Sequence, residues 1–90
     1  MSGYHDLIEL IAKRQMGILG KRNTIEIFSK TGLILDSEAK LENDNAGYEQ
    51  LEALTIALHE KYGPVPIMGC KIPVARRARE LNLKLPPLFA

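Results

Sequence analysis

The stretch NAGYEQLEALTIALHEKYGP, residues 45–64, carries the strongest helical pattern of the chain. Its apolar side chains recur every three or four residues, which is the spacing of one face of an α-helix. The stripe comprises Tyr48, Leu51, Leu54, Thr55, Leu58 and Tyr62, whereas Glu49, Glu52 and Glu60 lie off it. Asp44 or Asn45 is placed to cap the first N–H groups, and Gly63 followed by Pro64 ends the pattern. The sequence therefore predicts a long acidic helix from about residue 45 to residue 62.

Two shorter helices are predicted before the long one. The apolar spacing of residues 4–11 is helical, and the pattern weakens between Gly17 and Gly20 because glycine disfavours a helix. A second helix is expected at about residues 21–31. Gly32 is well placed to end it, because glycine adopts the left-handed conformation that helix termini use.

Residues 33–44, LILDSEAKLEND, separate these two helices from the long acidic helix. Leu33 and Leu35 alternate about Ile34, and Leu41 repeats the apolar signal after a polar turn. Alternation of this kind is typical of a half-buried strand, so we expect a short β-hairpin. A loop leading into a brief helix is the alternative interpretation.

A basic helix is predicted in the last third of the chain, and its start depends on proline. Either Pro73 is the first helical residue, where proline is tolerated, or the helix begins near Pro66 and kinks at Pro73. Pro86 and Pro87 end it in both cases. Its buried face is expected to contain Val74, Ala78 and Leu81.

Together the patterns predict a single α+β domain over residues 1–90, mainly α. Its expected order is two N-terminal helices, a short β-hairpin, a long acidic helix and a basic C-terminal helix. Ninety residues hold only one hydrophobic core, and 46% hydrophobic with 26% charged residues is an ordinary globular composition. No apolar run approaches the roughly 20 residues of a membrane span, and the single cysteine excludes an internal disulfide. We therefore expect a cytoplasmic protein without membrane association.

Charge is unevenly distributed along the chain although the net charge is only +1. Residues 1–32 hold five basic and three acidic residues, and residues 63–90 hold five basic and one acidic residue. Residues 33–62 hold two basic and seven acidic residues. An acidic middle between basic ends favours attraction within the fold or between subunits.

Two enzyme-like motifs fail on their spacing. GILGKRNT, residues 17–24, separates its two glycines by two residues where a phosphate-binding loop needs four. HEKYG, residues 59–63, has Gly63 where a zinc-protease motif needs its second histidine. The sequence therefore predicts no metal, no cofactor and no catalytic residue, and it favours a non-enzymatic role.

Cys70 is the one nucleophile that invites a chemical hypothesis. Lys71 and Arg77 are near it in the sequence, and cations of this kind lower the pKa of a thiol. A thiol or small-ligand site around Cys70 is therefore one alternative function. The competing interpretation is a small buried hydrophobe, which is how most free cysteines behave.

Three groups of residues are candidates for binding. The basic candidates for a partner or nucleic acid are Lys13, Arg14, Lys21, Arg22, Arg76, Arg77 and Arg79. The candidates for an oligomer contact are Leu85, Leu88 and Phe89 of the apolar tail. The preferred hypothesis is a small soluble interaction module that forms a homo-oligomer or binds a protein partner. Nucleic-acid binding by the basic N- and C-terminal helices is less favoured, because no aromatic residue lies among the arginines.

Overall fold

The computed structural model describes residues 3–89, and every regular element in that range is helical. The elements are α1 (Gly3–Ile18), α2 (Lys21–Lys30), α3 (Tyr48–Tyr62), α4 (Val65–Met68), α5 (Lys71–Glu80) and a 3-10 turn, η1 (Pro87–Phe89). The predicted α+β class is therefore wrong, since the described residues form no sheet. The predicted order of two N-terminal helices, a long helix and a basic C-terminal helix is confirmed.

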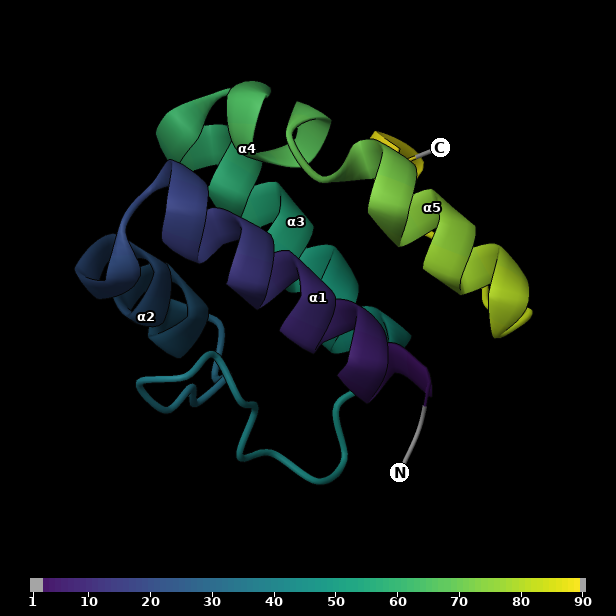
Figure 1. Ribbon diagram of the computed structural model, residues 1–90, viewed down its shortest axis with the longest axis horizontal. Coiled ribbons are helices and arrows are strands. Elements are labelled where there is room, and N and C mark those ends of the chain that lie inside the picture. Colours follow the sequence, from purple (N-terminus) through teal and green to yellow (C-terminus); the bar gives the residue numbers. More distant parts are fainter. Residues whose placement is uncertain (1–2, 90) are drawn as a thin grey trace.

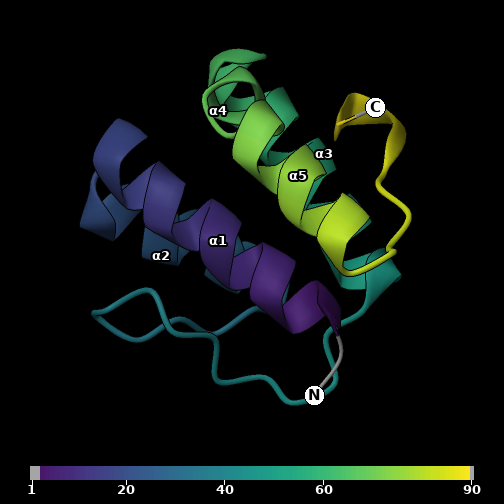
Figure 2. The ribbon, with the colours of Figure 1, turned by 45° about the vertical axis from the view of Figure 1, so that its right-hand side comes forward.

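Helix α1 is the centre of the fold. It contacts α2, α3 and α5, and it crosses in front of α3 between the other two (Figure 1). Helix α4 packs on α3 at one end of the molecule, and the long loop between α2 and α3 closes the other end (Figures 1 and 2). The buried face of α1 comprises His5, Leu7, Ile8, Ile11, Ala12 and Gln15. A buried face of this width is expected of a helix that packs against three neighbouring helices.

The predicted β-hairpin is absent from the described residues. Leu35 and Leu41 form one isolated antiparallel bridge, and the rest of the segment is a loop. The alternation seen in the sequence is present, because Leu33 and Leu35 are buried and Ile34 is exposed. The turn itself is organised by Asp36, whose carboxylate accepts N–H bonds from residues 38 and 40 at 2.8 and 2.9 Å.

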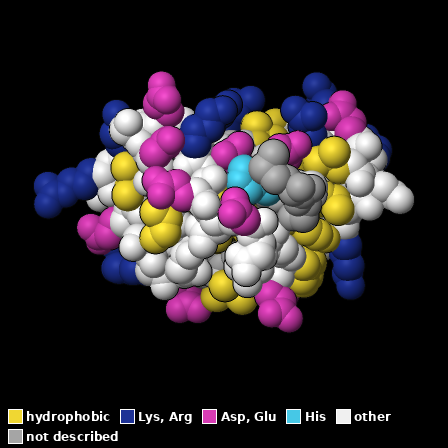
Figure 3. Space-filling view, turned by 90° about the horizontal axis from the view of Figure 1, so that it is seen from below, with side chains coloured by type: hydrophobic (Ala, Val, Ile, Leu, Met, Phe, Trp, Pro, Cys, Tyr) yellow, Lys and Arg dark blue, Asp and Glu magenta, His cyan; other side chains and the backbone are white. Residues whose placement is uncertain are grey.

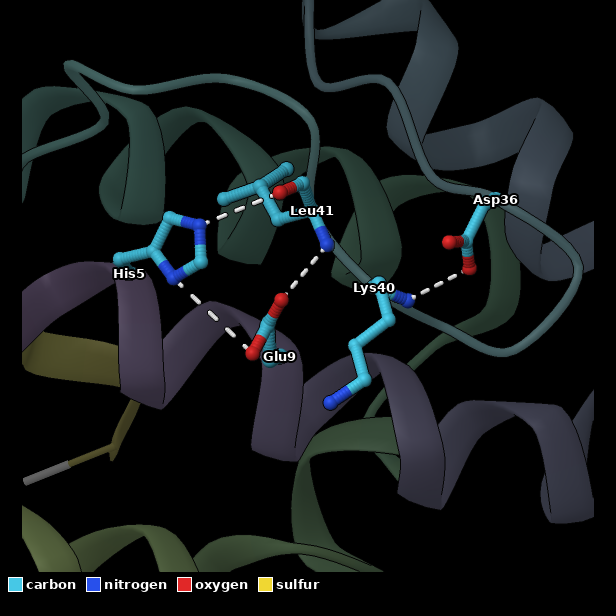
Figure 4. A network of polar contacts seen from close by, with 5 residues as sticks. All are labelled: His5, Glu9, Asp36, Lys40 and Leu41. Atoms are coloured by element: carbon cyan, nitrogen blue, oxygen red, sulfur yellow. Dashed lines mark hydrogen bonds and ion pairs between the residues drawn. The ribbon is translucent and has the colours of Figure 1, made fainter.

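Side chains of α1 anchor the loop through the backbone of Leu41. Glu9 Oε2 accepts a hydrogen bond from the N–H of Leu41 at 2.7 Å, and His5 Nε2 donates to the Leu41 carbonyl at 3.1 Å (Figure 4). His5 Nδ1 lies 3.9 Å from Glu9 Oε1. In the bridge between Leu35 and Leu41 these groups point away from the partner segment, so α1 anchors the loop without replacing its pairing.

The pairing ends next to the bridge. The Glu42 N–H donates to the Ile34 carbonyl at 2.8 Å, but the Ile34 N–H donates to Asn43 Oδ1 at 2.7 Å. Because a side chain takes this N–H, the hairpin does not extend past that point.

The junction between α4 and α5 differs from both predicted helix starts. The chain leaves α4 after Met68, passes through Gly69 and Cys70, and enters α5 at Lys71. Pro73 is the third residue of α5, where its missing N–H has no intrahelical partner to lose. Of the predicted buried face, Val74 and Ala78 are buried, and Leu81 is half-buried.

Helix α3 begins later than predicted, at Tyr48, after Gly47 in the N-cap position. Neither Asp44 nor Asn45 caps it; the side chain of Gln50 accepts the N–H of Gly47 at 2.8 Å instead. Its end at Tyr62 is as predicted, and Gly63 follows with a φ of 75°.

Candidate interaction surface

An exposed apolar surface lies where α1 ends and α4 meets α5. Val65, Met68 and Ile72 are 62%, 68% and 73% exposed, and they are the most exposed large hydrophobic residues in the described chain. Ile18, at the end of α1, joins them and is itself exposed. We call this group, with the basic residues Arg14 and Arg76 beside it, the α4 surface.

The local sequence dictates that this surface points outward. In the four-residue helix α4, Pro66 and Ile67 turn into the core, which leaves Val65 and Met68 on the outside. Gly69 lets Ile18 join them, because a Cβ at Gly69 would lie 2.6 Å from the Cδ1 atom of Ile18. The side chain of Ile18 therefore rests directly over the backbone of the α4–α5 junction.

Two exposed cations border the apolar residues of the α4 surface. Arg14 precedes Ile18 by four residues, so both lie on one side of α1. Arg14 is also close enough to Cys70 to act electrostatically on its thiol. Arg76 follows Ile72 by four residues, so both lie on one side of α5. The surface is therefore apolar at its centre and positive at its edge.

The seven basic residues proposed from the sequence do not all gather on one face. Lys13 shares a hollow of about 310 Å³ with Lys21, and a second hollow of about 150 Å³ with Arg77. Arg76 and Arg77 line the side of α5 that faces α1, whereas Arg79 lines a different hollow with Lys71 and Lys84. The arginines of α5 thus point to opposite sides of that helix.

Acidic groups neutralise several of these cations. Arg77 Nη1 lies 3.8 Å from Glu80 Oε1, and Asp6 and Glu9 line the hollow that Arg77 shares with Lys13. On the face that carries the long loop, acidic, basic and hydrophobic side chains are interspersed (Figure 3). This mixture is unlike the continuous positive surface that a nucleic-acid backbone selects.

The predicted apolar tail divides into an inner and an outer part. Phe89 is buried at 2% exposure and belongs to the hydrophobic core of its own chain, and Leu85 packs partly against that core. Leu88 is 38% exposed and remains open on the surface. Only Leu88 therefore presents substantial apolar surface to a second molecule.

Cys70 lies buried between α1 and the α4–α5 junction. Gln15 Nε2 donates to the Pro66 carbonyl at 2.8 Å and approaches Cys70 Sγ at 3.5 Å. Burial raises the pKa of the Cys70 thiol from its ordinary value near 9 to about 11, against smaller lowering effects of Gln15 and Arg14. A buried, protonated thiol is a poor nucleophile at neutral pH.

One further cluster was not proposed from the sequence. His5, Asp6 and Glu9 hold ligand-type atoms within 4.8 Å of one another. His5 and Glu9 already hold the backbone of Leu41, so their positions are explained by the fold. We assign this cluster a structural role in anchoring the long loop.

Sequence reasoning also missed the α4 surface. Its signal was present, because Val65, Met68 and Ile72 recur at intervals of three and four residues. Pro66, Ile67 and Cys70 between them are also apolar, so periodicity alone does not distinguish the inward side from the outward side. The packing of Ile67 and Cys70 into the core settles that choice.

Within residues 3–89 the geometry defines a small domain of five α-helices with an apolar, positively bordered surface at the α4–α5 junction. Comparison of the chain with protein-family models, with curated proteins and with solved structures found no match. No helix within residues 3–89 is both long and apolar enough to cross a membrane.

Proposed function

We propose that this protein is a non-enzymatic interaction module that associates with further copies of itself. The observation that carries the proposal is the α4 surface, where three large apolar side chains are more than 60% exposed on adjacent turns. Large exposed apolar patches on a folded domain usually mark an interaction site, because their burial against a partner is favourable. A cytoplasmic location is part of the same proposal.

The small size of the domain supports self-association. A chain of 90 residues buries a smaller fraction of its surface than a larger domain does, so its folded state gains much from added contacts. The apolar residues of the α4 surface require no rearrangement of the fold to contact a partner, since they are already exposed. The contact surface is thus preformed.

The thiol alternative is weakened by the burial of Cys70, which leaves its sulfur without access to a reagent or substrate. The nucleic-acid alternative retains one supporting observation, namely that Lys13 approaches both Lys21 and Arg77. Asp6 and Glu9 lie in the same region and repel phosphate groups. Binding of a DNA or RNA duplex that persists at about 0.15 M salt would favour this alternative over self-association.

Light scattering over a concentration series tests the proposal directly. We expect the mass of the wild-type protein to rise above the 10.0 kDa of one chain as concentration increases. Met68→Glu, which places a charge at the centre of the α4 surface, is expected to lower the association constant at least tenfold, because a carboxylate resists burial.

Ile34→Glu is the matched control for this variant. Ile34 is 47% exposed on the long loop, outside the α4 surface, and it receives the same apolar-to-acidic change. We expect its association to equal that of the wild type. A wild-type protein that stays monomeric up to millimolar concentration would contradict the proposal.

A further inference from the structure

The outward face of α3 is a second exposed surface, with the opposite charge. Ile56 is 45% exposed at its centre. Glu52 and Glu60 are four residues before and after Ile56, so they flank it on the same side of the helix. Glu49 is seven residues before Ile56 and lies within roughly 20° of it around the helix. Three carboxylates thus lie along the same side of α3 as the apolar side chain of Ile56.

The C-terminal tail completes this surface. Pro86, Pro87 and Leu88 line a hollow of about 180 Å³ together with Thr55 and Ile56 of α3. Glu52 forms its acidic edge. Leu88, the exposed part of the predicted oligomer tail, therefore lies beside Ile56. We call Glu49, Glu52, Ile56, Glu60, Pro87 and Leu88 the α3 surface.

The charges at the edges of both surfaces are available to a partner. Among residues 3–89, the ion pairs are His5–Glu9, Lys30–Glu26, Lys61–Glu26 and Arg77–Glu80. None of these pairs involves Arg14 or Arg76 of the α4 surface, or the three glutamates of the α3 surface. Both edges therefore keep their charge in the folded chain.

Charge decides how two copies meet. A two-fold symmetric contact brings identical patches together, so it would place two basic edges or two acidic edges face to face. Like charges across an interface cost free energy, whereas opposite charges steer the encounter and fix its register. Contact between the α4 surface of one copy and the α3 surface of another joins apolar to apolar and basic to acidic.

We infer that the α4 surface of one copy docks on the α3 surface of the next, in a head-to-tail arrangement. This inference rests on the proposed self-association and specifies its geometry. Met68 is the side chain suited to the hollow beside Leu88, because methionine is flexible and fills irregular apolar gaps. Each copy keeps one free surface of each kind, so the assembly closes into a ring or grows as a filament.

A mixing experiment with two variants tests this geometry. Met68→Glu blocks the α4 surface and leaves the α3 surface intact, whereas Ile56→Glu blocks the α3 surface and leaves the α4 surface intact. Each variant alone is expected to be monomeric. An equimolar mixture is expected to form a 1:1 heterodimer of about twice the 10.0 kDa chain mass, because one wild-type contact remains between the two chains.

Both substitutions are at exposed positions, and circular dichroism with thermal unfolding checks that each variant is folded. Ile72→Glu replaces Met68→Glu if that variant is unfolded, since Ile72 belongs to the same surface and is 73% exposed. The heterodimer is also expected to weaken as salt rises from about 0.05 to 0.5 M, because its edge charges are screened.

The outcomes separate this inference from the proposed function. A mixture that stays monomeric while the wild type associates would overturn the head-to-tail geometry and leave self-association standing. An Ile56→Glu variant that associates like the wild type would do the same. A monomeric wild type would overturn self-association, and the head-to-tail geometry with it.

Discussion

The thiol of Cys70 shows how burial sets the chemistry of a single residue. Its neighbours in the sequence, Lys71 and Arg77, suggested an activated nucleophile. In the fold the sulfur faces Gln15 and the Pro66 carbonyl instead, and Cys70 is fully buried. Desolvation outweighs the cation effect, so the pKa rises instead of falling.

We predict that Cys70 reacts with a thiol reagent only after unfolding. At pH 7.5–8 the native protein is expected to react at least 100-fold more slowly than the denatured protein, because its thiol is both buried and protonated. Labelling with a chromogenic disulfide, with and without denaturant, measures the ratio. Equal rates in the two states would restore the reactive-thiol hypothesis.

The raised pKa of the Cys70 thiol makes the free energy of unfolding depend on pH in the alkaline range. The folded state holds the Cys70 proton more tightly than the unfolded state does. The contribution of the protonated thiol to stability is therefore complete below pH 9 and is lost as pH rises toward about 11. Cys70→Ala removes the titrating group. We expect its free energy of unfolding to fall less steeply than that of the wild type between pH 9 and 11.

At the scale of elements, the sequence identified helices well and loops poorly. The boundaries of α1, α2 and the end of α3 follow from local signals, namely apolar spacing and the glycines at 20, 32 and 63. The long loop depends instead on His5 and Glu9, which are about 30 residues away along the chain. Local patterns contain no information about such distant partners, and apolar alternation does not show that the Asn43 side chain takes the N–H of Ile34, which ends the hairpin.

The α3–α4 turn provides a test of these local signals. Gly63 has φ 75° and ψ −159°, a conformation that is essentially restricted to glycine. Gly63→Ala is expected to lower the free energy of unfolding by about 1–3 kcal/mol. Gly17→Ala is the control, because Gly17 is helical and has no atom within 4 Å of an added Cβ.

Denaturant unfolding of both variants measures the difference. Gly17→Ala is expected to stabilise the protein by roughly 0.5–1 kcal/mol, since alanine has the higher helix propensity. The two glycine-to-alanine changes should thus have opposite signs. Destabilisation of equal size in both variants would show that backbone conformation is not the cause.

At the scale of the whole molecule, the C-terminal tail packs against the core that the helices form. Phe89 belongs to that core, whereas Leu88, the residue before it, faces outward beside Ile56. The predicted oligomer tail therefore has two separable roles. One residue closes the fold of its own chain, and the other borders the surface at which we propose a second copy docks.

Paired substitutions in the tail separate the two roles. Phe89→Ala is expected to lower the free energy of unfolding by about 3–5 kcal/mol, because it leaves a cavity in the core. Leu88→Ala is expected to change it by about 0.5 kcal/mol or less and to weaken self-association. Chemical unfolding at low concentration and light scattering at high concentration measure the two effects. Equal losses of stability would refute the division.

The sequence by itself determined where the longer helices α1, α2, α3 and α5 lie and which charges each segment carries, because both depend on neighbouring residues. Only the tertiary structure decided that residues 33–44 form a loop, since α1 anchors Leu41 and the Asn43 side chain takes the N–H of Ile34. It also decided which apolar residues remain outside: Met68 and Ile72 are exposed, whereas Cys70 and Phe89 are buried. Hydrophobicity is a property of the residue, but exposure depends on which helices pack over it, and that choice is made by the whole chain.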